Sequence, residues 1–197
     1  MKIISWNLRH SRGAEVVHIQ ELVCEHRPDL LLMQEVTAEI DGVADRLGGY
    51  YARSALPGRK HGLAAWSPHP FHRPAQNLAL QRGVLVRRIC QLLECEGYTI
   101  ANVHLSHGQM LNRLQLRRIA RALSPRAAIL GDCNMIGAPF LRGFQDVGAR
   151  QPTHRSAGLV PLRLDRCFVR GFHCTGAAVL APGASDHHPL LVSLVAI

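Results

Sequence analysis

The order of apolar and polar positions divides the chain into strand-like and helix-like segments. The runs at 29–36 and 126–132 are apolar almost throughout, which is typical of strands buried on both faces. Residues 14–26 and 109–123 instead carry apolar side chains at the spacing of an amphipathic helix. Further strands are predicted at 2–8, 62–66, 164–169, 173–180 and 189–195, and a short helix at 38–47.

Gly and Pro residues mark the segments that connect these elements. Gly97 separates two strand-like segments, 84–95 and 97–105, which together predict a hairpin. Residues 50–82 predict short strands and loops, and residues 135–162 predict mostly loop. Because strands outnumber helices and helices separate some of the strands, the pattern favours an α/β protein with helices packed outside β-sheet.

Composition narrows the class of protein without identifying it. A chain of 197 residues fits one domain, covering 1–197, and a content of 47% hydrophobic and 19% charged residues excludes a disordered chain. No stretch approaches about 18 consecutive apolar residues, so no transmembrane segment is predicted. No signal peptide is visible either. The six cysteines form no C-x-x-C pair, which argues against a zinc site and favours reduced thiols in a cytoplasmic protein.

The formal net charge is +9, and arginine supplies nearly all of it. Lys2 and Lys60 are the only lysines among the 23 basic residues. A positive surplus attracts polyanions, which favours nucleic acid or an anionic lipid head group as partner. An arginine-rich surface that is merely solvated explains the charge equally well, because no run of five basic residues occurs.

Acidic and amide side chains gather at the ends of the apolar strands. A carboxylate beside an apolar strand is costly unless something pairs with it, and a divalent cation is one such partner. Oxygen ligands without cysteine suit Mg²⁺ or Mn²⁺ better than Zn²⁺. One Asp in such a place more often caps a turn, whereas several at strand ends indicate a functional site. The residues are Glu35, Asp132, Asn134, Asp165, Asp186 and His187.

The alternation of side chains along a strand adds a further expectation, because residues two apart share a face. Asn102 shares a face with His104, and Asp132 with Asn134 if that strand continues. Two polar groups on one face of an apolar strand predict a polar cavity at that end. Taken alone, His104 is more simply interpreted as a core histidine whose hydrogen bonds are satisfied.

Seven short motifs resemble, in the same order, those of the endonuclease/exonuclease/phosphatase superfamily, which includes exonuclease III-like abasic endonucleases and deoxyribonuclease I. They are SWN (5–7), LMQEV (32–36), HGLAAWSP (61–68), NVHL (102–105), GDCN (131–134), RLDRCFV (163–169) and SDHHPLL (185–191). Each motif is weak alone, but the ordered set spans the chain from Ser5 to Leu191. The resemblance implies a four-layered αββα sandwich, with two mixed β-sheets packed face to face and flanking helices.

The resemblance also implies a cofactor and its ligands. Glu35 resembles the main metal-binding carboxylate, Asn7 the amide beside it, and Asp186 an outer ligand that acts through water. The implied cofactor is Mg²⁺, with Mn²⁺ as a substitute, and its charge would offset that of the phosphate.

The catalytic residues are implied in the same way. Asp132 and Asn134 resemble the pair that positions and activates the attacking water. His187 resembles the histidine that contacts the scissile phosphate, and Asp165 the carboxylate that orients it. His104 matches a position near the phosphate. In-line attack by water would then leave no covalent enzyme intermediate.

The motifs leave the substrate open between three hypotheses. A nuclease or DNA-repair phosphodiesterase acting on nucleic acid is supported by the charge and by candidate substrate contacts at Asn102, Arg113, Arg117, Arg142 and Arg163. A phosphatase or phosphodiesterase for a small phosphate ester or phospholipid head group is supported by the short loops. A catalytically silent binding module is the third hypothesis, and the filled catalytic positions argue against it. No protein partner is predicted.

Overall fold

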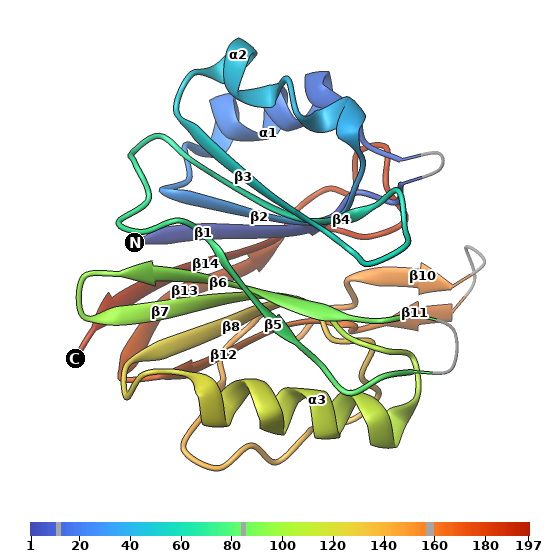
Figure 1. Ribbon diagram of the computed structural model, residues 1–197, viewed down its shortest axis with the longest axis vertical. Helices are drawn as coiled ribbons and strands as arrows, with labels where there is room; N and C mark the ends of the chain where they lie inside the picture. Colours follow the sequence, from blue (N-terminus) through green and yellow to red (C-terminus); the bar gives the residue numbers. More distant parts are fainter. Residues whose placement is uncertain (11–12, 84–85, 157–159) are drawn as a thin grey trace.

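Two β-sheets packed face to face form the centre of the computed structural model, which describes residues 1–10, 13–83, 86–156 and 160–197 (Figure 1). Over these residues the first sheet has the strand order β13-β14-β1-β2-β4-β3 and the second β5-β6-β7-β8-β12-β9, each with six strands. The pairs β1–β2 and β7–β8 are parallel and their neighbours antiparallel, so both sheets are mixed. The α/β sandwich predicted from the sequence is therefore confirmed.

The strand boundaries follow the apolar runs. The first sheet contains β1 (Lys2–Asn7), β2 (Leu30–Val36), β3 (Tyr50–Ala55), β4 (Gly62–Ser67), β13 (Phe172–Val179) and β14 (Leu190–Ala196). The second contains β5 (Gln76–Ala79), β6 (Ile89–Cys95), β7 (Tyr98–His104), β8 (Ala127–Asp132), β9 (Gln145–Asp146) and β12 (Asp165–Arg170). A separate pair is formed by β10 (His154–Ser156) and β11 (Val160–Leu162).

Helices form the two outer layers. The helix α1 (Val16–His26), the 3-10 turn Ala38–Ile40 and α2 (Val43–Leu47) cover the first sheet, and α3 (Gln109–Ala122) covers the second (Figure 1). Among the described residues, no helix combines the length and the apolar character that crossing a membrane requires.

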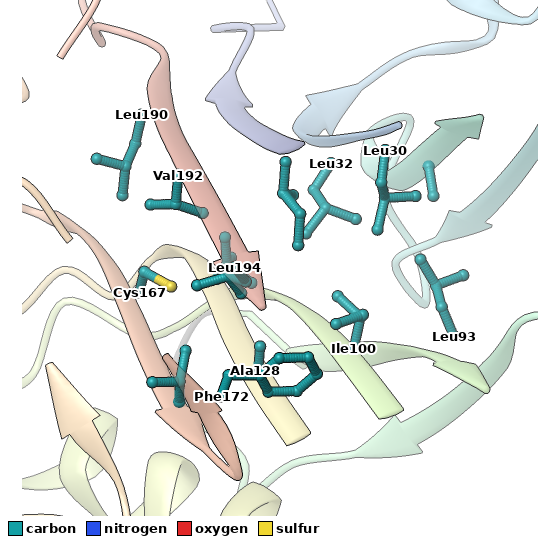
Figure 2. Packing of buried hydrophobic residues seen from close by; sticks show 14 of the residues in the cluster. Leu30, Leu32, Leu93, Ile100, Ala128, Cys167, Phe172, Leu190, Val192 and Leu194 are labelled. Carbon is teal, nitrogen blue, oxygen red and sulfur yellow. The ribbon is translucent and has the colours of Figure 1, made fainter. Parts of the chain in front are cut away.

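Side-chain alternation along each strand decides what fills the space between the sheets. On β1, Ile4 and Trp6 pack in the cluster under α1, whereas Ile3 packs between the sheets. On β8, Ala128 and Leu130 also pack between the sheets. Figure 2 shows this inter-sheet cluster, in which side chains from both sheets interdigitate. Burial of this apolar surface is the main force that holds the two sheets together.

The inward rows become polar toward one end of the sandwich. On β1 the inward row runs from Ile3 through Ser5 to Asn7, and on β8 it ends at Asp132, all buried. The same two rows that build the apolar core therefore deliver polar side chains to a single end of the sandwich, where the site lies.

Three segments differ from the sequence analysis. The expected helix at 38–47 is interrupted at Gly42, between the 3-10 turn and α2. The expected strand at 84–95 begins only at Ile89, and residues 84–85 lie outside the described residues. Residues 135–162, expected to be mostly loop, contain β9, β10 and β11. The pairing of β9 with β12 joins segments distant in sequence, which local patterns do not reveal. The other two strands are only three residues long each and pair with each other.

Candidate active site

The polar ends of the central strands meet in one cleft. His104 at the end of β7 lies opposite Asp132 at the end of β8, which in turn lies opposite Asp165 at the start of β12. Gly131 permits this close packing: its φ is 139°, and an added Cβ would lie 2.0 Å from the Val103 carbonyl oxygen. The resulting cavity, of about 470 Å³, is lined by Asn7, Arg9, His10, Glu35, His104, His107, Gln109, Asp132, Asn134, Ile136, His154, Leu162, Leu164, Asp186 and His187.

A bulge in β2 turns Glu35 into the cleft. The register with β4 shifts between Gln34 and Val36, and Glu35 has a φ of 58°, in the left-handed region that non-glycine residues rarely adopt. Such a strained position next to a cleft is typical of functional residues. Without the bulge, strict alternation would place Glu35 on the opposite face from Gln34.

His10 holds one oxygen of Glu35. The His10 backbone N–H donates to Oε2 at 3.2 Å, and its Nδ1 lies 2.5 Å from the same atom. Burial tends to raise the pKa of Glu35, but the hydrogen bonds and charge of His10 outweigh it and lower the pKa below its ordinary value. The other oxygen, Oε1, lies 3.9 Å from His104 Nε2. The His61 ring stacks on His10, with 4.3 Å between ring centroids.

Asp186 contacts two further side chains at the mouth of the cleft. Its Oδ2 lies 3.3 Å from Arg9 Nε and 3.9 Å from His154 Nε2. Next to it, Asn7 accepts a hydrogen bond from the Arg9 backbone N–H at 3.1 Å and donates its amide hydrogen to Asp132 Oδ2 at 3.0 Å. Asn7 thus links the buried Asp132 to Arg9, whose side chain contacts Asp186.

His187 is held as a cation in the interior of the cleft. Its Nδ1 lies 2.9 Å from Asp165 Oδ2, and its Nε2 lies 3.8 Å from Asp132 Oδ2. Burial lowers the pKa of His187, but the two carboxylates, Asp165 foremost, outweigh it and raise the pKa to about 10. The ring is therefore protonated at neutral pH, with its Nε2–H directed into the cleft.

Asp132 is buried between charged and amide groups. Burial and the nearby Asp165 raise its pKa, whereas His187 and the hydrogen bonds from Asn7 and Asn134 act in the opposite direction; the net direction is upward. The Asn134 backbone N–H donates to Asp132 Oδ1 at 2.9 Å. A carboxylate with a raised pKa is better matched to accepting a proton near neutral pH.

Burial and the neighbouring Arg88 keep His104 neutral. Both lower its pKa well below the ordinary value, so the ring can act as a neutral donor or acceptor 3.4 Å from Asp132 Oδ2. Arg88 itself is only 6% exposed, and its Nε and Nη1 have no hydrogen-bond partner among the described residues. Burial lowers the pKa of Arg88, and the charges of Asp132 and Glu35 act in the opposite direction. A buried guanidinium with two nitrogens free of hydrogen bonds among the described residues is suited to an incoming anion.

The oxygen atoms of this cleft fit a hard divalent cation. Glu35 retains Oε1 without a hydrogen bond in the described part of the chain, and Asp186 is engaged only by long contacts at its Oδ2. With Asn7 these residues form an oxygen-rich set of the kind that Mg²⁺ and Mn²⁺ prefer. His187 also lies near Asp132 and Asp165 in a set that could hold a metal ion. His187 also lies near His154 and Asp186 in a second such set. When no metal is bound, the two carboxylates favour the protonated ring, which donates hydrogen bonds.

The structure brings eight of the sequence-predicted residues into this cleft or its buried wall: Asn7, Glu35, His104, Asp132, Asn134, Asp165, Asp186 and His187. Asn102 does not reach it. Its amide group donates to the carbonyl oxygens of Met33 and Ala64 and to Gln91 Oε1, and it accepts from Gln34 Nε2 at 2.8 Å. With 0% exposure it bridges the two sheets below the cleft, and its contact with substrate stays a prediction.

Two of the four predicted arginine contacts, Arg113 and Arg163, have partners within the protein. Arg113 donates to the carbonyl oxygens of Gln109 and Ile136, which ties α3 to the following loop. Arg163 binds both oxygens of Asp146 at 2.7 Å. Neither side chain lines the cleft. Both guanidinium groups join segments of the protein in this structure, and their contacts with substrate stay predictions.

Several cleft residues escaped the sequence analysis. Arg9 and His10 lie two and three residues after Asn7, a predicted metal ligand at a strand end. That position in the sequence could have identified them as cleft residues. His154 lines the cleft from β10, with its ring 4.4 Å from that of His187. Arg88 carried no local signal, because only the folded sheet places it beside His104.

A two-sheet sandwich whose cleft combines carboxylates, amides and a buried imidazolium is the architecture of a phosphoesterase. Residues 4–187 match the Endonuclease/Exonuclease/phosphatase family, and the chain belongs to it. No curated protein matches the sequence.

Solved structures share the fold at low sequence identity. An endonuclease/exonuclease/phosphatase family protein from Bacteroides thetaiotaomicron has a TM-score of 0.79 at 18% identity, covering 100% of this chain and 98% of that chain. The mannosyl-6-phosphatase Bt3783 from Bacteroides thetaiotaomicron VPI-5482 has a TM-score of 0.77 at 18% identity, covering 99% of each chain. A D. rerio TDP2 humanised by 14 mutations has a TM-score of 0.74 at 14% identity, covering 99% of this chain and 98% of that chain.

Proposed function

We propose that this protein hydrolyses phosphodiester bonds of nucleic acid by attack of water, with Mg²⁺ as cofactor and Mn²⁺ as a substitute. The observation that carries the proposal is the buried pair of Asp132 and His187. Asp132 is a carboxylate whose pKa is raised, and His187 is an imidazolium whose Nε2 lies 3.8 Å from Asp132 Oδ2. A proton acceptor beside a fixed cationic donor is what water attack on an anionic phosphate requires.

Glu35, Asp186 and Asn7 would hold the divalent cation, which when bound supplies positive charge against the phosphate. Asp132 takes the proton of the attacking water while the oxygen–phosphorus bond forms and the bond to the leaving oxygen breaks. The hydrogen bonds from Asn7 and Asn134 orient the Asp132 carboxylate for this transfer.

The remaining residues act on the phosphate itself. His187 donates from Nε2–H to a non-bridging oxygen, and Asp165 keeps its ring charged and oriented. Arg88 adds a second positive charge, and its Nε and Nη1 hydrogens have no other partner among the described residues. The net charge of +9 supports a polyanionic substrate. A cytoplasmic location stays a prediction.

The test is a substrate panel with Mg²⁺, Mn²⁺ or EDTA, containing supercoiled plasmid, abasic duplex, single-stranded DNA, RNA, a phospholipid and a chromogenic phosphodiester. We expect metal-dependent cleavage of nucleic acid that Glu35→Gln and His187→Ala abolish. Glu21→Gln, an exposed change on α1, is the matched control and should retain full activity. Cleavage that persists in EDTA, or in Glu35→Gln, would refute the proposal.

A second candidate is hydrolysis of a small phosphate ester or phospholipid head group. The cavity of about 470 Å³ has the size of a small-molecule site, which favours it. Similarity in fold to a mannosyl-6-phosphatase agrees with this candidate. Turnover of small esters with weak salt dependence, and none of nucleic acid, would select it over the first proposal.

A further inference from the structure

A second concave surface lies on the outer side of α3, apart from the catalytic cleft. It is a hollow of about 730 Å³ between the C-terminal half of α3 and the loop that follows β8. Ala120, Leu123 and Leu141 line it with apolar surface. We call this hollow the arginine groove, because its other lining residues include Arg117, Arg121, Arg142 and Arg170.

No acidic residue lines the arginine groove in the described part of the chain. Asp132 is the single acid between residues 97 and 145, and it is buried in the cleft. The same segment contains the arginines Arg113, Arg117, Arg118, Arg121, Arg126 and Arg142. The charge of this face is therefore not balanced locally.

Three of the four groove arginines have no partner. Arg117, Arg121 and Arg142 are exposed and make no hydrogen bond or ion pair among the described residues. Arg170 differs, since it donates to the carbonyl oxygens of Leu123 and Ser124 and stacks on a phenylalanine ring. Three unpaired cations around one hollow repel each other, and a bound polyanion would relieve that repulsion.

An exposed aromatic ring completes the groove. Phe140 lines it and is 84% exposed, an unusual place for a large apolar side chain. Nearby Phe144 is instead covered by Arg170, whose guanidinium lies 4.5 Å from the ring centroid. A free aromatic face beside free arginines is the combination that binds single-stranded nucleic acid, because bases stack on the ring and phosphates pair with the guanidinium groups.

Both walls of the groove begin at the catalytic cleft. Gln109, the first residue of α3, lines the cleft, and so does Ile136 in the loop after β8. In Figure 1 this loop passes beneath α3, and residues of both line the arginine groove. Gln109 and Arg121 are twelve residues apart, which corresponds to about 18 Å of helix. At about 3.4 Å per nucleotide, that distance equals roughly five nucleotides.

We propose that the arginine groove binds a stretch of a nucleic acid strand that continues from the cleft, with phosphates on Arg117, Arg121 and Arg142 and a base against Phe140. The substrate class rests on the proposed function, but strand binding can be measured without catalysis. An anionic membrane is the competing occupant, because Met110 and Leu114 on the same helix are also exposed. The concave shape favours a strand over a bilayer surface.

The test uses fluorescence anisotropy, in EDTA, to measure how tightly the protein binds labelled nucleic acids. The probes are single-stranded 20-mers of DNA and of RNA, and a trinucleotide. The groove variant is Arg117→Gln/Arg142→Gln, with one change on each wall, and glutamine maintains helix propensity at 117. The matched control is Arg73→Gln/Arg150→Gln, which removes the same charge at exposed positions outside the groove. A third variant, Phe140→Ser, removes the ring.

We expect the groove variant to bind the 20-mers about tenfold more weakly than the control variant. Its log–log salt slope should be shallower by about 1.4. Phe140→Ser should weaken binding about fivefold or more without changing the slope. Trinucleotide binding should be the same in all variants, since it cannot span from cleft to groove. Whether DNA or RNA binds more tightly identifies the type of strand.

Equal losses in the groove and control variants would overturn the inference, because net charge alone would then explain binding. Unchanged 20-mer binding in the groove variant would also overturn it. So would a groove variant that loses binding only to phosphatidylglycerol vesicles, measured alongside the 20-mers. Turnover of a chromogenic phosphodiester with Mg²⁺, measured in parallel, tests the proposed function alone. Groove-dependent strand binding without any turnover would uphold this inference and remove the proposed catalysis.

Discussion

In the part of the cleft formed by β2, the loop after β1 and Asp186, which we call the open half, the carboxylates are partly exposed. Glu35 and Asp186 have side-chain exposures of 21% and 32%, and their partners His10 and Arg9 have 41% and 46%. These partners lie on long or surface-exposed side chains that can move aside.

In the part formed by β8, β12 and His187, the buried half, the exposures of Asp132, Asp165 and His187 are 2%, 0% and 7%. Sheet register fixes Asp132 opposite Asp165, and the Trp6 side chain holds the His187 backbone, because its indole N–H donates to the His187 carbonyl oxygen at 3.0 Å. The difference teaches that similar residue types can serve two purposes. Exposed carboxylates can exchange a side-chain partner for a cation, whereas buried ones tune the protonation of their neighbours.

The largest expected effect comes from Asp132→Asn in the buried half. An amide cannot accept the water proton, so kcat should fall by about 10²–10⁴-fold. Steady-state kinetics at saturating Mn²⁺ measure this, with thermal unfolding to show that the variant is folded. A kcat within about threefold of the wild-type value would mean that another group is the base.

Asp165→Asn should shift the pH dependence. In the wild type, kcat/KM should rise with pH as Asp132, whose pKa is raised above its ordinary value, loses its proton, and should fall near pH 10 as His187 loses its own. Removing the Asp165 charge lowers the pKa of His187, so the alkaline fall should move down by about one unit or more. If the alkaline limb of the profile does not move, His187 is not the group whose ionisation produces it.

His10→Ala addresses the open half and should have a milder effect. Loss of the group that orients Glu35 should weaken Mn²⁺ affinity about tenfold, as for other outer partners of metal ligands. At saturating Mn²⁺ the kcat should return to near the wild-type value. A low kcat that added metal does not restore would place His10 in the chemistry itself and blur the distinction between the halves.

Asn102→Ala should have the smallest effect on catalysis and a clear effect on stability. It leaves Gln91 Oε1 and two buried carbonyl oxygens without their donor, at a cost of about 1–3 kcal/mol in the free energy of unfolding. Denaturant unfolding measures that cost. If KM for substrate rises about tenfold instead, Asn102 does contact the substrate after all.

Much of the fold was readable from the sequence because apolar runs and alternation act locally. The acids at strand ends could be named for the same reason. What could not be read depends on contacts between distant elements. The alternation of Asn102 and His104 was a sound local argument, but Gln34 from the opposite sheet meets Asn102 and seals the space beneath the cleft. Arg163 likewise has a partner, Asp146, that only the folded chain brings near.

We propose that the open half binds the divalent cation and that the buried half accepts the proton of the attacking water. Mn²⁺ titration by calorimetry of the wild type, Glu35→Gln, Asp165→Asn and the control Glu21→Gln tests it most directly. We predict one site that Glu35→Gln abolishes and that Asp165→Asn and Glu21→Gln retain. Binding that survives in Glu35→Gln and disappears in Asp165→Asn would place the ion among Asp132, Asp165 and His187 and contradict the account.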